Sequence, residues 1–186
     1  GRGFTDFDKY KVGITRLDKQ FRDRVIFLIE EEGECKGFLG RGINDDVKPK
    51  YRNSKSDFAK LLGGVEEIEE DTNTLILVEG LLDKINVDKL LSLDKQSETK
   101  CCCTFGAKMK MFNIKNIILF YEGDVIGIIQ NYAFKLTQEF DRVTIILPPE
   151  GKDPGDINVE EIRESLKKRY SSMDFFRKKL NIIKLK

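Results

Sequence analysis

Short apolar runs separated by charged segments give this chain its pattern. Five runs are mostly apolar and have the length and composition of buried strands. They lie at residues 25–29, 75–78, 101–105, 117–121 and 143–147. Apolar residues at helical spacing occupy 87–93, 127–140 and 159–170. Strands that alternate with helices predict an α/β fold, with a parallel sheet covered by helices, beyond about residue 70.

The first 70 residues have a different pattern and predict a smaller α+β unit. A short helix followed by a strand or turn is expected in residues 4–20. The charged turn at 30–34 returns the chain into a strand at 35–39, which makes a hairpin with the strand at 25–29. Apolar residues between Phe58 and Val65 predict a short amphipathic helix.

Residues 47–55, called the basic loop below, lack apolar periodicity and are expected to form a loop or an irregular strand. They contain four cations, the ring of Tyr51 and two small polar side chains. Cations can neutralise phosphates and a ring can stack on a base, so this composition suits a strand of nucleic acid. A solvated linker has the same composition, and composition alone leaves both interpretations open.

Composition excludes several kinds of site. The chain is 40% hydrophobic and 35% charged with a net charge of +1, so total charge gives no indication of nucleic-acid binding. It contains no histidine, and adjacent cysteines at 101–103 would point to alternate faces of a strand. We therefore expect no histidine catalysis and no zinc in this chain. Cysteines of this kind suit a reducing cytoplasm, and no membrane-length apolar run is present.

Acidic residues stand just after three strands of the predicted parallel sheet. They are Glu79, then Glu122 and Asp124, then Asp153 and Asp156 in the loop at 151–156, called the acidic loop below. Parallel strands end at one edge of a sheet, so these carboxylates gather in one crevice. A divalent cation would relieve their repulsion, and oxygen-only ligands favour Mg²⁺ or Mn²⁺, which suit phosphoryl transfer. Asp156 is equally suited to cap the helix at 159–170.

Two motifs resemble the Toprim domain, which is shared by DnaG-type primases, topoisomerases, and some nucleases and repair proteins. The first motif is Glu79-Gly80 with Asp83. The second is the acid-x-acid pair Glu122-Gly123-Asp124, with Gly127 shortly after. The family usually has Asp-x-Asp at the second motif, and this chain has glutamate at its first position. Asp83, one helical turn beyond Glu79, is expected to be mostly structural.

The flanking segments resemble, in the same order, the RNA polymerase domain of bacterial DnaG primases and their phage relatives. The segments are Arg22-Asp23-Arg24-Val25-Ile26-Phe27, Gly40-Arg41, Lys50-Tyr51-Arg52-Asn53-Ser54 and Gly151-Lys152-Asp153-Pro154-Gly155-Asp156. The resemblance covers roughly residues 4–160. It implies a basic α+β subdomain at 1–70, a Toprim subdomain at 71–150, and the acidic loop with a helical segment at 151–186.

The same resemblance implies a DNA primase core that synthesises short RNA primers on single-stranded DNA from ribonucleoside triphosphates. Catalysis by metal-dependent nucleotidyl transfer would use Glu79, Glu122 and Asp124, with two or more Mg²⁺ or Mn²⁺ ions. The metal-site acids would be Glu79, Glu122, Asp124, Asp153 and Asp156. Nucleotide and nucleic acid would contact Arg22, Arg24, Lys50, Tyr51, Asn53, Lys60 and Lys108. A replicative helicase is the expected partner, in the cytoplasm of a bacterial or phage-infected cell.

Two other functions stay open at this point. A Toprim nuclease would use the same acids and metal to cleave phosphodiesters, although the basic loop with Arg22 and Arg24 favours polymerisation. A non-catalytic binding module is the other, with Glu122 marking an inactive site. Arg41 is equally suited to a structural ion pair. Because the chain has no zinc module and no P-loop, we expect a catalytic core alone, either part of a larger primase or of a phage-type system with separate subunits.

Overall fold

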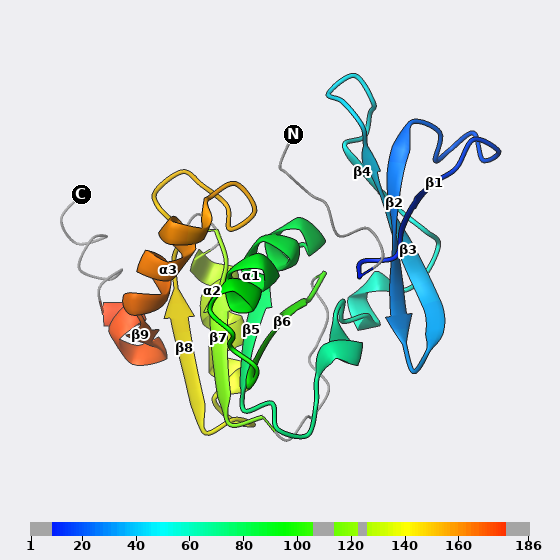
Figure 1. Cartoon of the computed structure of the whole chain (residues 1–186). Helices are drawn as coiled ribbons and strands as arrows, with labels where there is room; N and C mark the ends of the chain where they lie inside the picture. Colours follow the sequence, from blue (N-terminus) through cyan, green and yellow to red (C-terminus); the bar gives the residue numbers. More distant parts are fainter. Residues whose placement is uncertain (1–8, 106–113, 123–125, 178–186) are drawn as a thin grey trace.

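The computed structural model describes residues 9–105, 114–122 and 126–177, which form two sheets (Figure 1). Two of the predicted site residues, Lys108 and Asp124, lie outside these ranges. Within the described ranges, no helix has the length and hydrophobicity needed to cross a membrane.

The first sheet is antiparallel and has the strand order β1-β2-β3-β4. Its strands are β1 (Val12–Ile14), β2 (Arg24–Glu31), β3 (Glu34–Gly42) and β4 (Tyr51–Asn53). β2 and β3 form the predicted hairpin, which turns at Glu32 and Gly33 with φ angles of 57° and 72°. Part of the basic loop is therefore a short edge strand, within the expectation of a loop or an irregular strand.

The second sheet is mostly parallel and has the order β6-β5-β7-β8-β9. Its strands are β5 (Thr74–Val78), β6 (Thr99–Cys103), β7 (Asn116–Phe120), β8 (Arg142–Ile146) and β9 (Tyr170–Ser171). Only β9 runs antiparallel, beside β8. The predicted parallel sheet covered by helices is confirmed, and the apolar runs form its buried strands because both faces are covered.

Three helices cover the two faces of this sheet (Figure 1). α1 (Leu81–Leu93) and α3 (Val159–Lys167) lie on one face, and α2 (Ile126–Leu136) lies on the other. Side chains alternate along β5, so Ile76 and Val78 pack with α1 while Leu75 and Leu77 pack with α2. All four are fully buried.

Two predictions of local structure are wrong. The segment from Phe58 to Val65 is not an amphipathic helix but two 3₁₀ turns, η1 (Phe58–Lys60) and η2 (Val65–Glu67). Gly64 separates them with a left-handed φ of 90°. Asp156 does not cap α3. Asn158 does, because its Oδ1 accepts from the Glu161 amide at 2.9 Å while the Glu161 carboxylate accepts from the Asn158 amide at 2.9 Å.

The two sheets are joined by a common core. Phe27, Ile29 and Leu39 of the first sheet belong to the same apolar cluster as Ile76 and Leu81 of the second unit. The sheets fall on either side of the boundary expected at residue 70, and that boundary stays a prediction.

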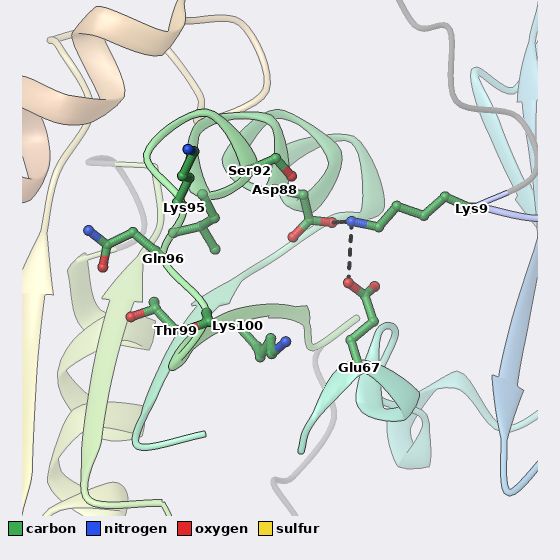
Figure 2. A pocket seen from close by; sticks show the side chains of 10 residues that line it. Lys9, Glu67, Asp88, Ser92, Lys95, Gln96, Thr99 and Lys100 are labelled. Carbon is green, nitrogen blue, oxygen red and sulfur yellow. Dashed lines mark ion pairs between the residues drawn. The ribbon is translucent and has the colours of Figure 1, made fainter. Parts of the chain in front are cut away.

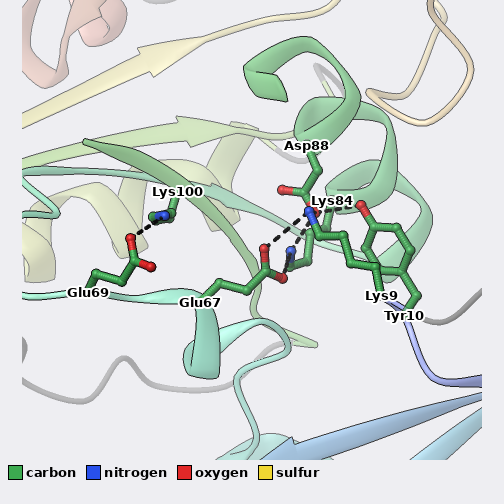
Figure 3. A network of polar contacts seen from close by, with 7 residues as sticks. All are labelled: Lys9, Tyr10, Glu67, Glu69, Lys84, Asp88 and Lys100. Atoms are coloured by element: carbon green, nitrogen blue, oxygen red, sulfur yellow. Dashed lines mark hydrogen bonds and ion pairs between the residues drawn. The ribbon is translucent and has the colours of Figure 1, made fainter. Parts of the chain in front are cut away.

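A buried ionic network lies beside this common core (Figure 3). Lys84 of α1 is 1% exposed, and its Nζ lies 2.5 Å from both Glu67 Oε1 and Asp88 Oδ2. The Tyr10 hydroxyl donates to the same Asp88 oxygen at 2.8 Å, and Lys9 Nζ is 3.4 Å from Glu67. The network therefore links the amino-terminal segment, η2 and α1.

Candidate active site

The described candidate acids all lie at the carboxyl edge of the parallel sheet. Glu79 follows β5 directly, and Glu122 stands two residues beyond β7. Asp153 and Asp156 lie in the loop between β8 and α3, on the same side of the sheet (Figure 1). The Glu79 side chain is exposed, whereas Glu122 and Asp153 are half-buried. The edge is therefore an acidic rim that solvent can reach.

Hydrogen bonds hold the backbone at Glu79 and at the next residue. The Asp83 carboxylate accepts from the Gly80 amide at 3.0 Å, a contact of the structural kind expected for Asp83. An acidic side chain in the first turn also suits the positive end of the α1 dipole. On the other side, the Phe105 amide donates to the Glu79 carbonyl oxygen at 3.1 Å. Backbone contacts thus fix where the Glu79 side chain begins.

A pair of buried hydroxyls lies beneath this rim. Thr104 Oγ1 is 2.9 Å from the Tyr121 hydroxyl and 3.4 Å from the Val78 carbonyl oxygen. Burial raises the pKa of Tyr121 well above its usual value, and this effect outweighs the hydrogen bond with Thr104, which acts in the opposite direction. Tyr121 therefore stays neutral. The sequence gives little signal for this pair, since its members are 17 residues apart.

The side chain of Asn86 attaches the acidic loop to α1. Asn86 Nδ2 donates to the Pro154 carbonyl at 2.8 Å and to the Ile157 carbonyl at 2.5 Å. Asp153 Oδ1 is buried and has no hydrogen-bond partner in the described part of the chain. Asn86 was missed by sequence reasoning. Its only signal is an asparagine, a poor helix former, inside a helix.

The arrangement is compatible with a divalent cation but does not by itself form a site. Among the described residues, no three acidic or cysteine side chains are grouped closely enough to hold a metal ion. Asp124 lies outside those residues, so the predicted five-acid set stays a prediction. The donors present are all carboxylate oxygens, which suit Mg²⁺ or Mn²⁺. The unpartnered oxygen of Asp153 is the kind of group that a bound cation would satisfy.

Residues of the basic loop lie on one face of the first sheet. Tyr51 pairs with Arg41 and Asn53 pairs with Leu39 across β3 and β4. Cross-strand partners share a face, and Leu39 packs in the core shared with the second sheet. Tyr51, Asn53 and Arg41 therefore lie on the sheet face that is turned toward the parallel sheet.

Arg41 and Tyr51 form a stacked pair on that face. The Arg41 guanidinium carbon lies 4.9 Å from the centre of the Tyr51 ring, and the guanidinium also hydrogen-bonds the Tyr51 hydroxyl. Among the described residues, the Arg41 side chain therefore bonds a tyrosine, where an ion pair with a carboxylate was the structural alternative. Tyr51 remains 42% exposed, so part of its ring can be reached by a ligand.

The remaining predicted cations divide into exposed and engaged residues. Arg22 and Lys50 are exposed, as a phosphate-binding role requires. Lys60 is exposed and pairs with Asp57 at 2.8 Å. Arg24 does not fit the prediction, since it is 3% exposed and its Nη1 lies 3.4 Å from the Gly40 carbonyl. A guanidinium buried against backbone carbonyls braces the sheet and cannot line its surface.

A separate polar pocket of about 320 Å³ lies beside α1 (Figure 2). Lys9, Lys95 and Lys100 line it, together with Ser92 and Thr99. Lys9 reaches across it to Asp88, with the two charged groups 3.8 Å apart. None of the four described candidate acids lines this pocket, so it is distinct from the acidic rim.

Comparisons with known proteins find relatives that are named DNA primase. No family model matches the chain. It is 30% identical over 171 residues to the DNA primase of Clostridium acetobutylicum, which covers 83% of this chain and 28% of that protein. It is 31% identical over 176 residues to the DNA primase of Pseudomonas aeruginosa, covering 83% of this chain and 25% of that protein. The chain thus spans only 28% and 25% of the length of these two relatives.

Solved structures show the same fold. The crystal structure of the RNA polymerase domain of Mycobacterium tuberculosis primase DnaG superposes with a TM-score of 0.61 at 18% identity, over 94% of this chain and 66% of that one. The Aquifex aeolicus primase structure, with its zinc-binding and RNA polymerase domains, gives 0.57 at 24% identity, over 85% and 43%.

Proposed function

We propose that this chain, a homologue of DNA primases with the fold of a DnaG RNA polymerase domain, is the catalytic core of a DNA primase. It would join ribonucleotides into short RNA primers on single-stranded DNA. The observation that supports this best is the placement of Glu79, Glu122 and Asp153 at one edge of the sheet, with the Arg41 and Tyr51 pair facing that sheet. An acidic rim beside a cationic, aromatic surface suits metal-bound triphosphates and a nucleic-acid strand.

The acids of the rim would hold two or more Mg²⁺ or Mn²⁺ ions. Glu79, Glu122 and Asp124 would be the catalytic ligands, with Asp153 and Asp156 completing the site. When bound, the metal neutralises phosphate oxygens and stabilises the charge that develops on the pyrophosphate leaving group. The protein's part is to hold carboxylate oxygens at the strand ends, where the backbone around Glu79 is fixed by Gly80 and Phe105.

The first sheet would bind the substrates. Arg22 and Lys50 are free to contact phosphates at the surface, and such contacts position a strand without reading its sequence. The exposed part of the Tyr51 ring would stack on a base, with Arg41 holding the ring in place. Asn53 lies on the same face and would add a polar contact. A replicative helicase in the bacterial or phage-infected cytoplasm would supply the single-stranded template.

Primer synthesis can be measured directly. The chain is incubated with single-stranded DNA, Mg²⁺ or Mn²⁺ and labelled ribonucleotides, and the products are separated by length. We expect short labelled RNA that requires the template and disappears with Glu79→Gln. Cleavage of the DNA without labelled product would indicate the nuclease alternative. Binding of DNA with neither reaction, and with no Mn²⁺ binding, would indicate the non-catalytic module.

A further inference from the structure

At the carboxyl edge of the parallel sheet, side chains connect the strands beyond their last paired residues. The ladder between β5 and β7 ends at the pair Leu77–Leu119, whereas β5 and β6 continue to Val78–Cys103. Glu79 and Glu122 stand two and three residues past that last β5–β7 pair. Backbone pairing alone therefore does not fix the distance between these two acids.

The hydroxyls of Thr104 and Tyr121 bridge the gap that the ladder leaves. β5 lies between β6 and β7 in the sheet, so a contact from Thr104 after β6 to Tyr121 after β7 crosses the end of β5. The two oxygens are 2.9 Å apart, and the residues are 2% and 6% exposed. This contact is a hydrogen bond of ordinary length away from water, where hydrogen bonds are electrostatically stronger.

Each end of the bridge is fixed to the backbone next to one of the acids. Thr104 binds β5 twice through the Val78 carbonyl oxygen, from its amide at 3.0 Å and from Oγ1 at 3.4 Å. Val78 immediately precedes Glu79. Tyr121 immediately precedes Glu122, and its ring packs edge-on against Tyr132 of α2 at 6.4 Å. Movement of either strand end would therefore break this contact.

We propose that Thr104 and Tyr121 are positioning residues that fix the separation of Glu79 and Glu122 for metal binding. This inference rests on the proposed function, since it assigns a metal to those acids. Neither hydroxyl is a metal ligand in this account. A positioning role predicts that loss of either hydroxyl weakens metal binding without removing any carboxylate.

The alternative is that the bridge is one more buried hydrogen bond with no bearing on the site. Thr144 offers a matched control for this alternative. It is 7% exposed in the middle of β8, and its Oγ1 lies 3.4 Å from the Ile117 carbonyl in the first half of β7, away from the carboxyl edge. Thr144→Val and Thr104→Val make the same chemical change, and only the second lies next to the acids.

The experiment compares Mn²⁺ affinity, from the electron paramagnetic resonance of free Mn²⁺, for the wild-type chain and for Tyr121→Phe, Thr104→Val, Thr144→Val and Glu79→Gln. Circular dichroism and thermal unfolding confirm that each variant is folded. We expect Tyr121→Phe and Thr104→Val to raise the Kd for Mn²⁺ about ten-fold. Thr144→Val should keep the wild-type Kd while losing a similar amount of thermal stability. In primer synthesis, the first two variants should lower kcat and leave the KM for ribonucleotide nearly unchanged.

The outcomes separate the two proposals. Wild-type Mn²⁺ affinity in both Tyr121→Phe and Thr104→Val, with affinity lost in Glu79→Gln, would overturn the positioning role and leave the metal site intact. An equal loss in Thr144→Val would also overturn it, because the effect would then follow from general destabilisation. Absence of Mn²⁺ binding by the wild-type chain would overturn the proposed metal site and this inference together.

Discussion

The side-chain amide of Asn86 donates to the main-chain carbonyl of Pro154 at 2.8 Å, across 68 residues of sequence. A second bond from the same nitrogen reaches the Ile157 carbonyl. Asn86 lies on α1, the helix that begins beside Glu79, so the acidic loop and the first candidate acid are attached to one rigid element. The position of Asp153 relative to Glu79 thus depends on an uncharged side chain that lies outside both motifs.

Asn86→Ala should loosen the acidic loop. Two buried carbonyl groups lose their donor, which costs about 1–3 kcal/mol of unfolding free energy. Hydrogen exchange of residues 151–158 should become faster, and Mn²⁺ affinity should fall. Lys89→Ala, an exposed change on the same helix, is the control and should alter neither. Unchanged exchange in the loop would show that Asn86 does not hold it.

Lys84→Met should destabilise the protein strongly. It removes the nearest cation from the buried Asp88 carboxylate and from Glu67, which keep the more distant Lys9 at 3.8 Å and 3.4 Å, and removing one partner of a buried ion pair costs about 3–5 kcal/mol. Urea unfolding monitored by circular dichroism measures this free energy. Lys89→Met makes the same change at an exposed position and should stay within about 0.5 kcal/mol of wild type. Equal losses in both variants would contradict the role assigned to the network.

Stability should decline in alkaline solution. Burial raises the pKa of Cys101 and Cys103 well above the usual range, raises that of Tyr121, and raises that of Tyr132 to about 12. Each group holds its proton more tightly in the folded state, so the native state binds more protons than the unfolded state once the pH exceeds the unfolded pKa. Unfolding free energy should therefore fall from about pH 8.5, the ordinary thiol value, upward.

The matching experiment measures urea unfolding in a reducing buffer between pH 6 and 11. Little change is expected between pH 6 and 8, since the chain contains no histidine. A stability that rises above pH 9 would contradict the raised pKa values of the buried thiols and phenols.

Lys50→Ala should weaken binding of single-stranded DNA without unfolding the protein. Lys50 is exposed, and a lysine that contacts a phosphate releases about 0.7 of a counterion on a single strand. The slope of log Kd against log salt should thus decrease by about that amount. Lys95→Ala, an exposed cation in the loop after α1, should leave the slope unchanged. A wild-type slope in Lys50→Ala would remove this residue from the interface.

The parallel sheet and the edge that carries the acids were predictable because both follow from local pattern. The apolar run 75–78 forms a strand that is buried on both faces of the sheet. Glu79 follows it directly, so parallel pairing alone places that residue at the carboxyl edge. The hairpin of β2 and β3 was predictable for the same reason, from a charged turn between two strands. Asp83 follows from its spacing, since a residue three positions into a helix can reach the amide at its start.

Most of the errors and omissions came from contacts between distant segments, and one came from local cap geometry. Arg24 has the composition of a surface cation, but its side of β2 is covered by Phe21, whose ring approaches Gly40 so closely that an added Cβ would lie 2.8 Å from it. Thr104 and Tyr121 meet across the end of β5 because β6 and β7 flank that strand, an order that hydrophobic periodicity does not contain. Asp156 is a plausible cap for α3 from its place near the start of the helix, but Asn158 makes the capping hydrogen bond.

The most direct test of the central claim is a crystal structure of this chain with Mn²⁺ and a ribonucleoside triphosphate. Anomalous scattering from Mn²⁺ locates the metal independently of the surrounding density. We expect Mn²⁺ at the carboxyl edge, coordinated by Glu79 and at least one of Glu122, Asp124 and Asp153, with the triphosphate between that edge and the face that carries Tyr51. A nucleotide bound elsewhere, or an edge without Mn²⁺ at saturating concentration, would contradict it.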